Sequence, residues 1–100
     1  MTMLVADLQH YLDMPENAPG PARRMAQHLT AIVSAATAID AGVHWTTTLT
    51  CKRRPRHRAC PGNLVVRRID IPSSIEWQCA ECGDDGVISN WEHTPFDLRR

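Results

Sequence analysis

Four cysteines constrain the fold of this 100-residue chain more than any other feature. Cys79 and Cys82 stand two residues apart and are followed at once by Gly83, which is typical of a metal-binding knuckle. A closed structural zinc site is tetrahedral and needs four ligands, most often thiolates. We therefore predict that Cys51 and Cys60 supply the other two ligands and that zinc serves the folding of the chain.

The cysteines flank a predicted β-hairpin. Strands are predicted at residues 45–50, 64–71, 75–79 and 86–91, where β-branched and aromatic residues gather between turn signals. Because the hairpin of the second and third strands is antiparallel, its two ends meet, and we expect Cys60 beside Cys79. The apolar positions of the second strand slip in phase near Arg67 and Arg68, which predicts a β-bulge there.

The first 42 residues are predicted to be helical. A short amphipathic helix over residues 4–12 is followed by a segment rich in proline and glycine, and then by a helix from Pro21 to Ala41 capped by Gly42. One apolar stripe runs along the second helix, through Met25, Leu29, Ile32, Ala36 and Ile39. We expect this stripe to pack inside the domain; the alternative is a homodimer interface through the 21–41 helix.

Together these elements predict an α+β fold. An N-terminal helical hairpin, residues 1–42, packs on a C-terminal zinc ribbon of three or four antiparallel strands, residues 43–100, and the two regions form one compact unit.

The C-terminal region resembles a zinc ribbon, in which two cysteine pairs are bridged by a hairpin. The resemblance covers about residues 45–92, and the stretch from Trp77 to Trp91 looks like the end of small uncharacterised bacterial zinc-ribbon proteins. It implies a bound metal and no activity. The first pair departs from the usual two-residue spacing, because eight residues separate Cys51 from Cys60; the insertion also carries His57, which is an alternative ligand in place of either cysteine.

Other uses of the same cysteines fit less well. A rubredoxin-like iron site needs two short knuckles, a thioredoxin-like redox pair needs a strand–helix context, and a nucleobase deaminase needs motifs that this chain lacks. Two disulfides are the alternative for an exported protein. Because the start of the chain lacks the basic flank and apolar stretch of a secretory signal, we expect a cytoplasmic protein. No apolar run reaches the roughly 20 residues of a membrane helix.

A basic segment lies between the first two cysteines. Its cationic residues are Lys52, Arg53, Arg54, Arg56 and Arg58, and Arg67 and Arg68 extend the set along the next strand. These side chains are predicted to contact nucleic-acid phosphates. In the competing interpretation they offset the negative charge of a nearby zinc–thiolate centre. Lysine and arginine balance aspartate and glutamate over the whole chain, eleven against eleven, so the overall charge does not point to nucleic acid.

The function predicted from these features is non-catalytic. The five histidines are scattered, with no nucleophile or carboxylate at a recognisable spacing beside them. We expect a small regulatory or accessory protein that binds zinc and contacts nucleic acid. The alternative is a protein–protein interaction module or adaptor whose zinc is purely structural.

Overall fold

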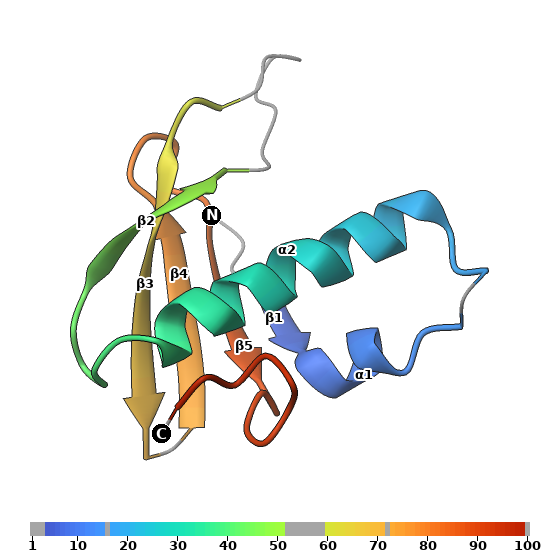
Figure 1. Cartoon of the computed structure of the whole chain (residues 1–100). Helices are drawn as coiled ribbons and strands as arrows, with labels where there is room; N and C mark the ends of the chain where they lie inside the picture. The colour runs from blue at the N-terminus through green and yellow to red at the C-terminus, as the bar shows by residue number, and fades with distance from the viewer. Residues whose placement is uncertain (1–3, 16, 52–59, 72, 100) are drawn as a thin grey trace.

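The computed structural model describes residues 4–15, 17–51, 60–71 and 73–99, which form a five-stranded sheet with one long helix across one face (Figure 1). In chain order the elements are β1 (Leu4–Asp7), α1 (Leu8–Leu12), α2 (Gly20–Thr37), β2 (Trp45–Thr50), β3 (Asn63–Asp70), β4 (Ser73–Cys79) and β5 (Asp85–Ser89). The predicted basic segment, His57 included, lies outside the described residues.

The sheet is mixed, with the strand order β1-β5-β4-β3-β2. The last four strands pair antiparallel, whereas β1 pairs parallel with β5, with Leu4 opposite Gly86 and Asp7 opposite Ser89. The predicted helical hairpin on an antiparallel ribbon is therefore wrong: the N-terminal region supplies an edge strand, and α2 is the one long helix of the described chain.

The error at residues 4–12 has a local physical cause. Their apolar positions fit a helical stripe, but β5 offers an unpaired edge after it has paired with β4, and Leu4–Asp7 satisfies that edge. The chain turns helical only at Leu8. There, the carboxylate of Asp7 caps the short helix α1 by accepting a hydrogen bond from the backbone N–H of Gln9 at 3.0 Å.

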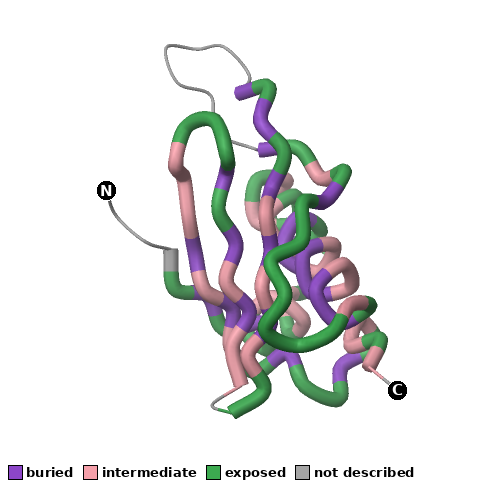
Figure 2. Tube along the Cα trace, turned by 90° about the vertical axis from the view of Figure 1, so that its left-hand side faces the viewer, coloured by how far each residue is buried: buried purple, intermediate pink, exposed green. Residues whose placement is uncertain are grey.

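The core lies between α2 and the inner face of the sheet. The helix contributes Leu29, Ile32, Val33 and Ala36, all fully buried, so the predicted apolar stripe packs inside the domain. Along the strands the buried positions alternate, as the purple segments of Figure 2 show, and they include Ala6, Leu64, Val66, Ile75, Trp77 and Ile88. Burial of this apolar surface is the main force that holds the helix on the sheet.

Gly86 makes room for one large core side chain. A Cβ added at Gly86 would lie 2.6 Å from the indole of Trp77, which is its partner across the β4–β5 ladder. The indole therefore lies over β5 and meets the imidazole of His28 edge to face, with ring centroids 5.8 Å apart.

No bulge interrupts β3, contrary to the prediction. Its register with β4 is continuous from Leu64 opposite Cys79 to Asp70 opposite Ser73. The apparent slip in phase arises because Arg68 occupies an inward position and is only 7% exposed. The irregularity in the sheet lies in β2 instead, where the register shifts between Thr46 and Thr50.

Arg68 closes the C-terminal end of α2. Its Nη1 donates to the backbone oxygens of Ala36, Thr37 and Ile39, at 3.2, 3.2 and 2.8 Å, and its Nε donates to Asp70 at 2.9 Å. Ala36 and Thr37 belong to the last turn of α2, whose carbonyls find no partner further along the helix, and a cation suits the negative end of the helix dipole. The helix therefore ends at Thr37 rather than at the predicted Ala41.

Gly42 plays a different part from the predicted cap. It adopts a left-handed φ of 81° in the turn that leads to β2, and its N–H donates to the backbone oxygen of Arg68 at 2.8 Å.

The C-terminal tail returns to α2. The backbone oxygen of Phe96 accepts from the hydroxyl of Ser34 at 3.2 Å, and the N–H of Leu98 donates to the hydroxyl of Thr37 at 2.8 Å. The guanidinium of Arg99 lies 4.6 Å from the centroid of the fully buried Trp91. Neither described helix has the length and apolar character needed to cross a membrane.

Candidate metal centre

The four predicted cysteines converge at one end of the sheet. Their sulfur atoms all lie within 4.8 Å of one another, with 3.7 Å between Cys51 and Cys82 and 3.6 Å between Cys60 and Cys79. A tetrahedral zinc site with Zn–S bonds of about 2.3 Å has sulfur–sulfur edges of about 3.8 Å. The Cys51–Cys82 and Cys60–Cys79 separations are close to that edge length, and both are far too long for the roughly 2.05 Å of a disulfide bond.

Two strand ends and two turns position the sulfurs. Cys51 directly follows β2, and Cys79 is the last residue of β4. The β3–β4 register sets Leu64 opposite Cys79, so the residues just before β3, with Cys60 among them, reach the same end of the sheet. The expected contact between Cys60 and Cys79 is therefore confirmed.

The knuckle after β4 is a tight turn. The N–H of Gly83 donates to the backbone oxygen of Cys79 at 3.1 Å, and the N–H of Cys79 donates to the backbone oxygen of Asp84 at 2.7 Å. Gly83 adopts a left-handed φ of 76°, which side chains disfavour. This turn carries Cys82 back over the end of the strand.

Gly62 allows the two halves of the site to approach. A Cβ at this position would lie 2.5 Å from the sulfur of Cys79 and 2.9 Å from the side chain of Glu81. The backbone oxygen of Gly62 also accepts from the N–H of Cys51 at 2.9 Å. Gly62 therefore joins the first cysteine to the second pair without filling the space that the sulfurs need.

The environment of Cys79 favours the thiolate. Burial raises the pKa of this thiol, but the backbone N–H groups of Cys82 and Glu81, together with the thiol of Cys60, lower it more, to about 7. At Cys60, a hydrogen bond from the Gly62 N–H lowers the pKa. Burial and the neighbouring thiols of Cys79 and Cys82 raise the pKa by more, so the net shift is upward. Thiols crowded in this way share protons until a metal cation displaces those protons.

The donor set suits a closed site. Cys51, Cys60 and Cys79 are buried and Cys82 lies at the surface. Within the described residues, four sulfurs fill all four tetrahedral positions and leave none for a substrate, which is the pattern of structural centres. Tetrahedral sulfur ligands are typical of zinc or iron, and magnesium and calcium prefer oxygen.

The two arginines that were grouped with the basic segment lie on opposite faces of β3. Arg68 is buried, and its guanidinium is engaged by helix carbonyls and Asp70, so it holds the fold together. Arg67 is half-buried on the outer face, opposite Glu76. Alternation along a strand separates neighbours in this way, and only the buried environment of Arg68 could have revealed its role.

Comparisons of the chain with protein-family models, with curated proteins and with solved structures found no match. The resemblance to zinc ribbons therefore stays a prediction. The geometry by itself defines the class: a small α+β protein whose mixed sheet ends in a four-cysteine centre able to hold a metal ion.

Proposed function

We propose that this protein is a non-catalytic zinc-binding accessory factor whose metal centre holds a basic segment ready to contact nucleic-acid phosphates. The observation that carries the proposal is the convergence of the four sulfurs at tetrahedral separations. Zinc is the metal we assign, because a closed four-thiolate site is its most common structural arrangement.

The link to nucleic acid comes from where the basic segment begins and ends. It starts directly after Cys51 and finishes directly before Cys60, and the sulfurs of these two residues belong to one cluster. A metal bound there fixes both ends of the segment and lowers the conformational entropy it loses on binding. The cations so anchored are Lys52, Arg53, Arg54, Arg56 and Arg58.

The metal is tested first. Native mass spectrometry of protein purified without added metal is expected to show one zinc ion per chain. Structural zinc contributes roughly 10–16 kcal/mol of apparent binding free energy in finger peptides, more than the margin of a small domain. Chelation, or Cys79→Ser, is therefore expected to unfold the end of the sheet that carries the cysteines. Iron in place of zinc would reassign the metal, and two disulfides with no metal would remove the centre altogether.

The contact with nucleic acid is tested by salt dependence. Affinity for DNA or RNA is expected to fall linearly with the logarithm of salt concentration, with a slope that corresponds to about 3–5 phosphate contacts. Replacing the four arginines of the segment by glutamine is expected to flatten that slope and weaken binding equally across sequences, with the zinc content unchanged. The control is Arg23→Gln with Arg24→Gln, which removes two exposed charges from α2.

The second candidate is a protein–protein interaction module with purely structural zinc. Exposed apolar side chains at the start of β2 favour it, since Val43 and Trp45 are 45% and 50% exposed. A wild-type protein that binds zinc but neither DNA nor RNA at low salt, where charge attraction is strongest, would support this second function instead.

A further inference from the structure

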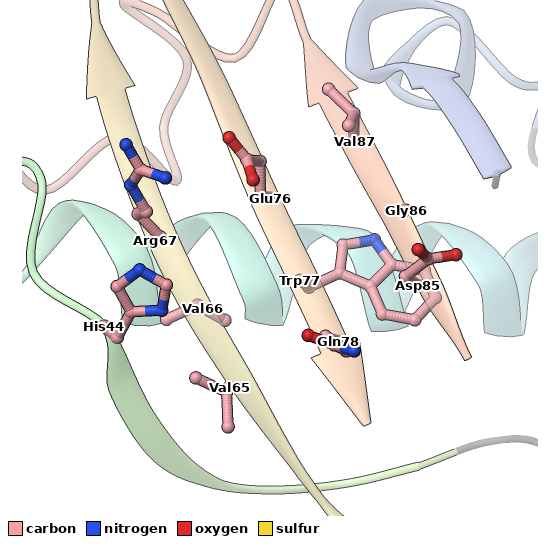
Figure 3. A pocket seen from close by; sticks show the side chains of 10 residues that line it. All are labelled: His44, Val65, Val66, Arg67, Glu76, Trp77, Gln78, Asp85, Gly86 and Val87. Atoms are coloured by element: carbon pink, nitrogen blue, oxygen red, sulfur yellow. The ribbon is translucent and has the colours of Figure 1, made fainter. Parts of the chain in front are cut away.

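The sheet face opposite α2 carries charged side chains in register across neighbouring strands. Arg67 on β3 pairs with Glu76 on β4, and Glu76 pairs in turn with Val87 on β5. Figure 3 shows these side chains around a hollow of about 100 Å³, with His44 and Asp85 among its other lining residues. In the same view α2 lies behind the strands, on the other face of the sheet.

Arg67 and Glu76 are neighbours but do not satisfy each other. They form no ion pair, and the Nε of Arg67 is buried with no hydrogen-bond partner in the described chain. A buried donor without an acceptor destabilises a protein by roughly 1–3 kcal/mol. Because Arg67 as a whole is only half-buried, a change of its rotamer could bring the guanidinium out to an acceptor on another molecule.

We propose that this face binds a second copy of the chain, related to the first by a two-fold axis. The axis lies midway between the two stacked sheets, parallel to the strands and above the line between β3 and β4. Such an axis sets Arg67 of each copy over Glu76 of the other. Sheets stack about 10 Å apart, a distance that an arginine and a glutamate side chain reach across together. The proposal does not depend on the metal or on the basic segment.

The distribution of charge selects a second copy over an unrelated partner. In a two-fold contact, if residue i of one copy meets residue j of the other, then residue j of the first copy also meets residue i of the second. One arginine directly beside one glutamate fulfils that requirement by itself, and a single axis then forms two equivalent ion pairs.

The test is a charge exchange between copies, followed by sedimentation velocity of zinc-loaded protein up to about 100 µM. Arg67→Glu alone and Glu76→Arg alone each place like charges together, and each is expected to lower the association constant about a hundredfold or more. An equimolar mixture of the two variants restores both attractions and is expected to form heterodimers. The double variant is expected to form homodimers again. The control is Arg23→Glu, an exposed charge reversal on α2, which should leave dimers intact.

Zinc content and far-ultraviolet circular dichroism of each variant establish that it is folded. A wild-type protein that stays monomeric over the whole range would overturn the proposal, and the face would then be open to water or to another partner. Dimers that persist in both single variants, or a mixture that stays monomeric, would also overturn it.

Discussion

Replacement of Arg68 by methionine tests whether a buried arginine joins α2 to the sheet. The guanidinium donates to three carbonyls and to one carboxylate, those of Ala36, Thr37, Ile39 and Asp70. Nη1 has only two hydrogens for its three carbonyls, so the guanidinium makes about three full hydrogen bonds in all, and charged hydrogen bonds contribute about 1.5–3 kcal/mol each. Water can replace the bond to Asp70, which is exposed, and the methionine side chain regains about 1–2 kcal/mol through apolar burial. We therefore expect the free energy of unfolding to fall by about 3–4 kcal/mol, a large share of the 5–15 kcal/mol typical of a domain.

The assay is urea unfolding of zinc-loaded protein, followed by tryptophan fluorescence, at one protein concentration throughout. Arg68→Lys is expected to recover only part of the loss, because an ammonium group cannot reach the carbonyls and Asp70 with the fixed fork of a guanidinium. Arg24→Met, an equivalent change at an exposed position of α2, should change stability by less than about 1 kcal/mol. A loss below about 1 kcal/mol in Arg68→Met would refute the reasoning.

Two further predictions concern the metal centre and the tail. Gly62→Ala is expected to weaken zinc binding in a competition titration, because the new Cβ would crowd the sulfur of Cys79. The control is Gly42→Ala, which strains the backbone but meets no atom within 4 Å, and which should leave zinc affinity unchanged. Asp97→Asn should destabilise the protein at neutral pH, because hydrogen bonds from Arg99 hold the pKa of Asp97 well below its usual range. That stabilisation is present above the unfolded pKa of about 3.9 and is lost as the pH falls below it. In acid unfolding curves, the difference in stability between wild type and variant should therefore narrow below about pH 4. A difference that does not change with pH would contradict this prediction.

Much of the sheet and all four candidate ligands could be predicted from the residues themselves. The predicted strand at residues 45–50 coincides with β2. The bounds of the other three predicted strands differ from those of β3, β4 and β5 by no more than two residues at any end. Strand formation here follows from local composition, and the spacing of the cysteines around a hairpin brings Cys60 to Cys79 by the geometry of antiparallel pairing. Local pattern therefore determined both the hairpin and the end of it where the cysteines gather.

Two features depended on contacts between residues far apart in the sequence. Leu4–Asp7 has the pattern of a helix and becomes a strand because the edge of β5, more than 80 residues away, offers unpaired backbone groups. Arg68 has the character of a surface residue and is buried because the end of α2 presents carbonyls that require a donor. In both cases the deciding group is a backbone donor or acceptor supplied by another element, and a local pattern of side chains carries no information about where such a group will lie.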